Sequence, residues 1–293
     1  MSLDPVARFR RFSRAVTSEV GALDDSFLGR GRSLGAARVL NAIGHGHCDV
    51  AALRAFLGLD SGLTSRLLRG LEDEGLILTA PHPEDARRRV AALTETGAAE
   101  FAAYEALSDE RARDTLSRHP RPEALLAAMD LVASALARDR ITLDEDDPRG
   151  PDARYCLGEY YGELSRRLAT GFDVSLSRDP EATAMIRPRG VFLVARSDGL
   201  ALGCAGLKGT GDGTAEVKRV WVAPSARGLG LARRMMTRVE EIAAELGIGL
   251  LRLDTNSALP EAVALYHREG WSEIPRFNDD PYPDTFFEKR LGL

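Results

Sequence analysis

The pattern of hydrophobic positions divides the chain into a helical part and a part that contains strands. Residues 3–137 show apolar positions at helical spacing almost throughout, with one short exception. Later runs such as "GVFLVARSDGLALGCAGLK" and "TAEVKRVWV" have the composition of strands, and Asp198-Gly199 is typical of a hairpin turn. The two parts differ in secondary-structure class, which predicts two domains.

The predicted boundary lies near the stretch "DEDDPRGPD" at 144–152. It is acidic, contains proline and glycine, and has no apolar periodicity. A length of 293 residues is compatible with two domains. We therefore predict domains at 1–137 and 138–293.

The first domain contains a predicted pair of short helices in "DVAALRAFLGLDSGLTSRLLRGLEDEGLILTA". Asp49 can cap the first helix, and Asp60 or Ser61 the second. After Gly75 the sequence predicts two strands joined by a tip, which together form a wing. The inward face of the second helix is expected to consist of Leu63, Leu67, Leu68 and Leu71.

The outer face of the second helix offers hydroxyls and guanidinium groups, which suit the major groove of DNA. We expect the DNA-binding residues of this helix to be Ser61, Gly62, Thr64, Ser65, Arg66 and Arg69. Three arginines on the expected wing tip are placed to reach backbone phosphates or a minor groove. They are Arg87, Arg88 and Arg89.

These segments resemble the MarR family of transcriptional regulators. "LDSGLTSRLLRGLEDEGLI" is similar to the family's recognition helix, and "DARRRVAALTETG" to its wing pattern D-x-R-x-x-x-x-x-L-T-x-x-G. The resemblance covers roughly 5–137 and implies a homodimer that binds a double-stranded DNA operator. It also implies that the first helix and the long helices around 98–137 hold the dimer together. Gly62 departs from the family, in which many members carry a side chain at that position.

Charge leaves an alternative open for this domain. The whole chain has a net charge of −5, which argues against wholesale nucleic-acid binding, so any DNA contact must come from a local patch. Residues 1–137 contain 17 Arg and 19 Asp plus Glu, which gives −2. The alternative is a dimerisation module that no longer binds DNA.

The cysteines and histidines favour neither a disulfide framework nor a metal site. Cys48, Cys156 and Cys204 are odd in number and far apart. His45, His47 and Cys48 are zinc-binding types, but no fourth ligand is spaced nearby, so we expect a polar loop and no metal. The start is unlike a signal peptide and no apolar run approaches a membrane span, so we expect a cytoplasmic protein without a membrane partner.

The second domain contains a glycine-rich turn, "RGLGLARRMM" at 227–236, that runs into a predicted helix. Such a junction leaves the backbone amides of 228–232 uncovered at a helix N-terminus, which favours a phosphate. A dinucleotide fold is one interpretation, with Asp254 on a ribose. Arg233 at the third glycine position, the five-residue gap at 223–227 and the short remaining chain all count against it.

The other interpretation is a coenzyme A site, because Arg227 to Ala232 match the R/Q-x-x-G-x-G/A motif of GNAT N-acetyltransferases. "AEVKRVWVAP" resembles the family's fourth strand, "LRLDTN" the fifth, "EAVALYHREGW" the following helix and "FFEKRL" the last strand. The resemblance covers about 138–293 and implies an α/β fold with a mixed, mostly antiparallel sheet. The implied acetyl-CoA-binding residues are Trp221, Val222, Arg227, Gly228, Leu229, Gly230, Leu231, Ala232, Arg233 and Asn256.

Acetyl transfer to an amine makes two demands on side chains. An alkylamine with a pKa near 10 must lose a proton, and Glu216 is the candidate base unless it is only paired with Lys218. The departing thiolate must gain a proton, and Tyr266 is the candidate acid unless it only packs. Cys204 has no histidine partner nearby, so we expect direct transfer without an acyl-enzyme.

The sequence thus predicts a MarR-like winged helix-turn-helix domain, dominated by α-helix, followed by a GNAT acetyltransferase domain. The expected function is a homodimeric regulator and enzyme that moves acetyl from acetyl-CoA to an unidentified amine. Two alternatives stay open: a transcription factor that senses acyl-CoA without turnover, and an enzyme whose winged helix only dimerises it. "YCLGEYYGELSRRLATGF" and "PRFNDDPYPDTFF" are expected to line the acceptor pocket.

Overall fold

The computed structural model describes residues 4–176 and 184–292. The chain forms two compact units, Met1–Pro122 and Glu123–Leu293. This division lies before the predicted boundary at 137/138, and the domain limits stay a prediction. Among the described residues, no helix is both long and apolar enough to span a membrane.

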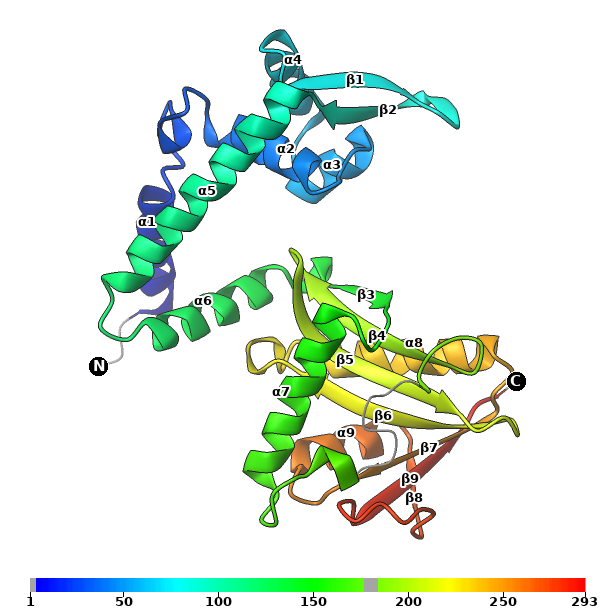
Figure 1. The fold of residues 1–293 in the computed structure, drawn as a ribbon. Coiled ribbons are helices and arrows are strands. Elements are labelled where there is room, and N and C mark those ends of the chain that lie inside the picture. The colour runs from blue at the N-terminus through cyan, green and yellow to red at the C-terminus, as the bar shows by residue number, and fades with distance from the viewer. Residues whose placement is uncertain (1–3, 177–183, 293) are drawn as a thin grey trace. The chain divides into compact units, whose positions relative to one another are not determined.

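The first unit is helical apart from one hairpin (Figure 1). Asp49 Oδ1 accepts a hydrogen bond from the Ala52 N–H, and Asp60 Oδ1 from the Leu63 N–H, both at 2.8 Å, so both expected caps are present. The elements are α1 (Pro5–Glu19), η1 (Phe27–Gly29), α2 (Leu34–Gly44), α3 (Val50–Leu57), α4 (Ser61–Asp73), β1 (Ile77–His82), β2 (Asp85–Leu93) and α5 (Glu95–Ser117).

Two glycines fix the connections around the hairpin. Gly75 has a φ of +69°, which ends α4 at low cost because glycine lacks a Cβ. Thr94 caps α5 by accepting a hydrogen bond from the Gly97 N–H at 2.9 Å. A Cβ on Gly97 would lie 1.8 Å from the Leu76 carbonyl oxygen, so α5 begins in direct backbone contact with the residue before β1.

The second unit is built on a seven-stranded sheet with the order β3-β4-β5-β6-β7-β9-β8. Its elements are α6 (Pro122–Leu136), η2 (Arg138–Arg140), β3 (Thr142–Glu145), α7 (Pro151–Arg167), η3 (Val174–Leu176), β4 (Gly190–Ser197), β5 (Leu200–Gly209), β6 (Thr214–Val222), η4 (Pro224–Ala226), α8 (Leu231–Glu245), β7 (Leu250–Thr255), α9 (Pro260–Arg268), β8 (Ser272–Ile274) and β9 (Thr285–Arg290).

The sheet is mixed and mostly antiparallel, as predicted, because only β6 and β7 pair in parallel among the described strands. This strand order excludes the dinucleotide fold. The Asp198-Gly199 turn is present, with positive φ at both residues. Asp144 and Glu145, from the stretch near the predicted boundary, are part of β3 and pair with β4.

Helices α7 and α8 cover opposite faces of the sheet (Figure 1). A Cβ on Gly203 of β5 would touch the Met235 side chain of α8, whereas the next residue, Cys204, lies against Cys156 of α7. Successive strand residues point to opposite faces, so the two helices lie on different sides. Both layers are closely packed, with Phe192 and Met235 fully buried.

Strands β6 and β7 separate halfway along their length. Their pairing ends at Val217 and Leu253, and Arg219 then takes a φ of +58° where the register to β5 shifts. A bulge of this kind bends the strand and turns its edge away from its neighbour. The rest of β6, up to Val222, therefore presents an edge that β7 does not cover.

Helix α6 is fastened beside the glycine-rich loop. Ser134 Oγ donates a hydrogen bond to Ser225 Oγ of η4 at 3.4 Å. Arg234 Nη2 donates to the Ile141 carbonyl oxygen at 2.6 Å, and its Nη1 to that of Arg138 at 3.4 Å. The end of α6 is thus held by the turn before the loop and by the helix after it.

Candidate functional site

The glycine-rich loop has the backbone that its composition predicts. Gly228 and Gly230 have φ values of +76° and +79°, and Gly230 is the N-cap of α8. The Arg234 N–H donates to the Gly230 carbonyl oxygen at 3.1 Å, which is the first bond of the helix. The N–H groups of 231–233 precede it and have no partner within the helix, so they are open to an anion.

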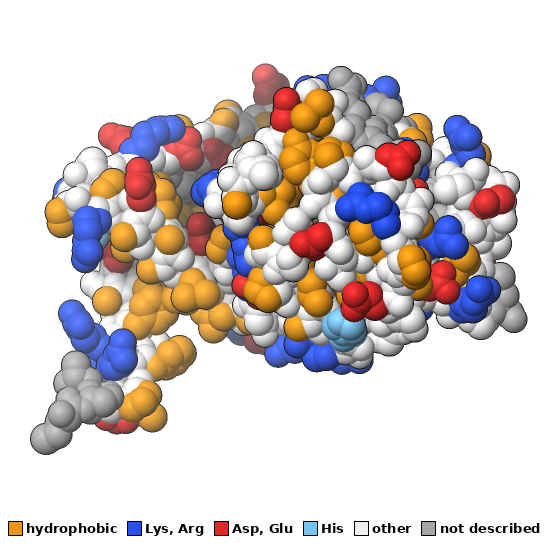
Figure 2. Space-filling view, turned by 90° about the horizontal axis from the view of Figure 1, so that it is seen from below, with side chains coloured by type: hydrophobic (Ala, Val, Ile, Leu, Met, Phe, Trp, Pro, Cys, Tyr) orange, Lys and Arg blue, Asp and Glu red, His pale blue; other side chains and the backbone are white. Residues whose placement is uncertain are grey.

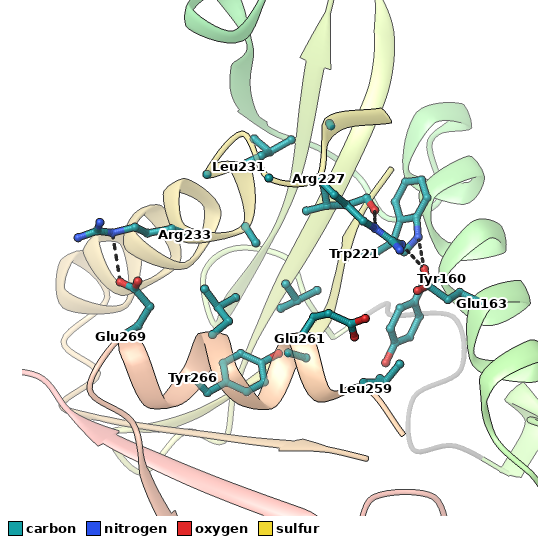
Figure 3. A pocket seen from close by; sticks show the side chains of 18 of the residues that line it. Tyr160, Glu163, Trp221, Arg227, Leu231, Arg233, Leu259, Glu261, Tyr266 and Glu269 are labelled. Carbon is teal, nitrogen blue, oxygen red and sulfur yellow. Dashed lines mark hydrogen bonds and ion pairs between the residues drawn. The ribbon is translucent and has the colours of Figure 1, made fainter. Parts of the chain in front are cut away.

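A cavity of about 780 Å³ opens beside this loop (Figure 3). Its walls come from α7, the end of β6, the loop, the first turn of α8, and α9. Of the expected cofactor residues it is lined by Trp221, Val222, Arg227, Gly228, Gly230, Leu231, Ala232 and Arg233, and Tyr266 lines it too. The structure brings these residues together in one hollow.

Two expected cofactor residues do not line this cavity. Leu229 packs, half-buried, against the core beneath the loop. Asn256 donates from Nδ2 to the Tyr282 carbonyl oxygen at 2.6 Å and accepts from the Ala258 N–H at 2.8 Å. Both ends of its amide are therefore engaged within the protein.

Arg227 does not reach toward the helix N-terminus. Its Nη2 donates to Glu163 of α7 at 2.5 Å, and its Nε donates to the Val222 carbonyl oxygen at 3.1 Å. The Trp221 indole N–H donates to the same Glu163 carboxylate at 3.1 Å. Figure 3 shows these side chains converging from β6, the loop and α7.

Further ion pairs cross the cavity walls. Arg167 bridges Glu163, 3.2 Å away on its own helix, and Glu261 of α9 at 2.8 Å. Arg233 of α8 pairs with Glu269 at 3.3 Å. Arg167, Arg227 and Arg233 are therefore each paired with a carboxylate.

These carboxylates and their α7 partners are not among the residues predicted from the sequence. Tyr160, Glu163 and Arg167 recur at spacings of three and four, which places them on one face of a helix. That spacing was visible in the sequence. The segment containing them was expected at an acceptor pocket, and it lines the same cavity as the cofactor residues.

Two tyrosine hydroxyls lie at the α7–α9 side of the cavity. Burial raises the pKa of the Tyr266 hydroxyl above its ordinary value, and the nearby Tyr160 and Asp254 add to the effect. Burial also raises the pKa of Tyr160 to about 12, against the opposing influence of the Arg219 guanidinium. Tyr266 thus remains protonated at neutral pH, which a proton donor requires.

Glu216 lies in a cluster of charged side chains on β6 and β7. It does not line the cavity, and its carboxylate pairs with Lys218 at 3.2 Å. Lys218 also contacts Asp254 at 2.6 Å, and Asp254 accepts from Asn278 Nδ2 at 2.6 Å. This geometry matches the paired alternative. The base role of Glu216 stays a prediction.

In the first unit, α4 presents most of its expected DNA-binding residues to solvent. Ser61, Gly62, Ser65, Arg66 and Arg69 are exposed. The expectation for Thr64 is wrong: its side chain is only 3% exposed and donates to the Asp60 carbonyl oxygen at 2.8 Å. Its hydroxyl is therefore satisfied by the preceding turn of the chain.

The wing arginines lie on a strand and not on the tip. The hairpin turns at residues 83–84, between His82 and Asp85, while Arg87, Arg88 and Arg89 belong to β2. The register shifts at Pro81, which moves the turn toward the acidic residues. The tip therefore carries Glu84 and Asp85.

The three arginines differ in what they contact. Arg88 pairs with Asp49 at 2.9 Å, and Arg89 bonds the Thr79 hydroxyl. The Arg87 backbone N–H donates to Asp85 at 3.0 Å, while its side chain is exposed. Arg87 is thus the wing arginine most available to a phosphate.

The loop that contains His45, His47 and Cys48 makes aromatic contacts through its two histidines. His47 stacks on Phe56 with ring centroids 4.0 Å apart, and His45 lies edge-on to Phe101 at 5.2 Å. Cys48 is exposed. Within the described parts of the chain, no three His, Cys, Asp or Glu side chains form a group suited to a metal ion.

Helix α1 carries an exposed apolar stripe beside basic residues. In Figure 2, hydrophobic side chains and arginines lie together next to the grey N-terminal residues, where α1 begins. The stripe consists of Val6, Phe9, Phe12, Val16 and Val20, which are 39% to 64% exposed. Exposed apolar groups at helical spacing are typical of a surface that a partner covers.

Comparison with known proteins finds a family match within each unit. Residues 158–271 match the acetyltransferase (GNAT) family, and residues 30–88 match the MarR family. An IAA acetyltransferase of Azospirillum brasilense is 34% identical over 134 residues, which cover 44% of this chain and 86% of that protein. The chain belongs to the GNAT acetyltransferase family. It carries a MarR-family region in the same polypeptide.

Solved structures give a more distant likeness. An acetyltransferase of the GNAT family from Staphylococcus aureus Mu50 is 19% identical, with a TM-score of 0.47, over 52% of this chain and 99% of that one. A putative acetyltransferase from Salmonella typhimurium, solved with its cofactor acetyl-CoA, is also 19% identical. Its TM-score is 0.41, over 52% of this chain and 95% of that one.

Proposed function

We propose that the second unit transfers an acetyl group from acetyl-CoA to an amine. The observation that carries this proposal is the single cavity that joins an uncovered helix N-terminus to a buried phenol. The N–H groups of 231–233 suit the pyrophosphate, and the uncovered edge of β6 suits the amides of the pantetheine arm. Tyr266 lines the same cavity.

The bound thioester supplies an activated acetyl group, and the protein has to manage two protons. The amine nitrogen forms a bond to the acetyl carbon while the carbon–sulfur bond breaks and sulfur keeps the electron pair. Tyr266 donates its proton to that sulfur, because its raised pKa keeps the hydroxyl protonated. A base must remove the proton of the amine, and Glu216 stays the residue proposed for that step.

We also propose that the first unit binds an operator as part of a homodimer. Support comes from α4, which exposes two guanidinium groups and two serine hydroxyls, and from the exposed apolar stripe of α1. In a dimer, each protomer offers one copy of α4, so the operator would be a pseudo-palindrome. Thr64 is no longer among the proposed contacts.

Calorimetry with coenzyme A tests the cofactor site. Gly230→Asp places a carboxylate at the N-cap of α8, and aspartate tolerates the left-handed backbone there better than most residues. We expect coenzyme A affinity to collapse while the fold persists. Ala244→Asp is the matched control, because it adds the same charge on an exposed position of the same helix. Unchanged affinity in a folded Gly230→Asp variant would refute the site.

A turnover screen of acetyl-CoA against an amine library then tests the reaction. Turnover supports the enzyme, and binding without turnover would instead support an acyl-CoA sensor. Selection from random DNA tests the first unit in parallel. Turnover without any sequence preference for DNA would leave the winged helix as a dimerisation module.

A further inference from the structure

Glu163 contacts two cofactor-site residues that come from different segments. One carboxylate oxygen, Oε2, accepts both from Trp221 Nε1 at 3.1 Å and from Arg227 Nη2 at 2.5 Å. The other, Oε1, accepts from Arg167 at 3.2 Å. The Glu163 side chain is only 16% exposed, so these bonds are partly screened from water.

The Arg227 guanidinium also holds the uncovered edge of β6. The Ala223 N–H donates to the Leu202 carbonyl oxygen of β5 at 2.8 Å. Backbone polar groups of successive strand residues point to opposite edges, so the Val222 carbonyl points away from β5, where β7 has already separated. Arg227 Nε donates to that carbonyl at 3.1 Å.

We propose that Glu163 is a positioning residue of the cofactor site. It holds Arg227 against the end of β6, so Arg227 acts as a strut for the strand and not as a ligand of the phosphates. This inference rests on the proposed function, because it concerns the strand that receives the pantetheine arm. It gives Arg227 a different role from the expected one, which was to bind acetyl-CoA directly.

Three features favour the strut. The Arg227 guanidinium is already bonded on two sides, by a carboxylate and by a backbone carbonyl. Arg167 braces Glu163 from the next turn of α7 and is itself tied to Glu261 of α9. The phosphate position is served by backbone N–H groups, which need no help from a side chain that faces elsewhere.

The test compares two ligands that share the pyrophosphate and the 3′-phosphate but differ in the pantetheine arm. Coenzyme A carries the arm, and adenosine 3′-phosphate 5′-diphosphate lacks it. By calorimetry on the full chain, Glu163→Ala should weaken the binding of coenzyme A about tenfold and leave the binding of adenosine 3′-phosphate 5′-diphosphate unchanged. Glu159→Ala is the matched control, since it removes an exposed carboxylate one turn earlier on α7.

Three other outcomes are possible, and each has a different meaning. If Glu163 were withholding Arg227 from the phosphates, its loss would tighten both ligands. Equal weakening of both would mean that the loop itself had been disturbed. No change in the affinity for either ligand would mean that the Glu163 contacts do not contribute to binding. Each of these three results would overturn the proposal.

A second variant keeps the test valid if Glu163→Ala folds poorly. Glu163→Gln retains an acceptor oxygen, so it should show the same ligand selectivity with a smaller loss. In an Arg227→Ala background, Glu163→Ala should lower the affinity for coenzyme A by less than about threefold, because the contact between Glu163 and Arg227 is already absent. In turnover, Glu163→Ala should raise KM for acetyl-CoA and change kcat little.

Failure of this inference can be told apart from failure of the proposed function. A parent protein that does not bind coenzyme A refutes the proposed function. A parent protein that binds coenzyme A, with an affinity that Glu163→Ala does not change, refutes only this inference.

Discussion

Arg234 donates a hydrogen bond to the Ile141 carbonyl oxygen at 2.6 Å, which joins the first turn of α8 to the residues that follow α6. The same turn begins at Gly230, the N-cap where the pyrophosphate is proposed to bind. We therefore expect a ligand bound at this turn to act on the attachment of α6. Through α6 the second unit continues directly into the segment that is expected to set the spacing of the recognition helices.

We expect acetyl-CoA and operator DNA to change each other's affinity. Typical coupling between two sites is about 5–150-fold, and linkage requires the factor to be equal in both directions. Titrating operator with and without saturating acetyl-CoA, and acetyl-CoA with and without operator, measures both directions. Equal affinities in all arms would mean that the two units act independently.

The Arg234 contact gives a control for this coupling. Arg234→Ala removes the bonds to Arg138 and Ile141 and leaves the N–H groups of 231–233 in place. Coenzyme A affinity should stay within about threefold of the parent, while the coupling factor should fall toward one. An unchanged coupling factor would place the connection elsewhere.

Tyr266→Phe should lower kcat by about 10²–10⁴-fold, with little change in acetyl-CoA affinity, because the phenylalanine fills the space but donates no proton. The raised pKa of Tyr266 adds a pH prediction. The protonated form is the active one, so the kcat of the parent should not decline through loss of the phenol proton near the ordinary tyrosine pKa of 10.0. A kcat within a few-fold of the parent would leave Tyr266 as a packing residue.

Arg66→Ala should weaken specific DNA binding by about 1–3 kcal/mol and relax base preference, if Arg66 reads a base edge from the exposed face of α4. Arg87→Ala should weaken binding to all DNA sequences alike, because its exposed side chain can contact a phosphate. It should also reduce the slope of log affinity against log salt concentration by about one unit. Thr64→Val is the informative control. Its side chain is buried, so binding preference should stay as in the parent.

Glu100→Gln should destabilise the first unit at neutral pH by about 1–2 kcal/mol, because Glu100 binds both Arg30 and Arg32. The hydrogen bond from Arg30, and then the charges of both arginines, hold the pKa of Glu100 below its usual 4.5. A lowered carboxyl pKa contributes stability above the unfolded value and loses it as pH falls through the folded value. The difference between parent and variant should therefore vanish in acid. Urea unfolding at several pH values measures it, and a pH-independent difference would point to packing.

The sequence predicts those features that depend on residues close together in the chain. The glycine positions, the caps at Asp49 and Asp60 and the amphipathic α8 depend on residues a few positions apart, and each was predicted. Glu163 was missed because its role comes from the packing of α7 against a strand 58 residues further along. Helical spacing alone could show which face it occupies but not what that face meets.

The errors also have particular causes. Thr64 was placed on the outer surface because threonine is polar, but its hydroxyl is satisfied by the Asp60 carbonyl one turn earlier, so the side chain can be buried. The wing arginines were assigned to the tip because the irregular register at Pro81 cannot be derived from residue types.

The missing side chain of Gly97 has a consequence for how related chains can vary. Any larger residue there would collide with the Leu76 carbonyl and push the start of α5 away from the base of the wing. A chain that lacks glycine at this position must therefore have rebuilt the junction. Among relatives of the first unit, the presence of glycine at this position should distinguish chains with this wing geometry from chains with a different one.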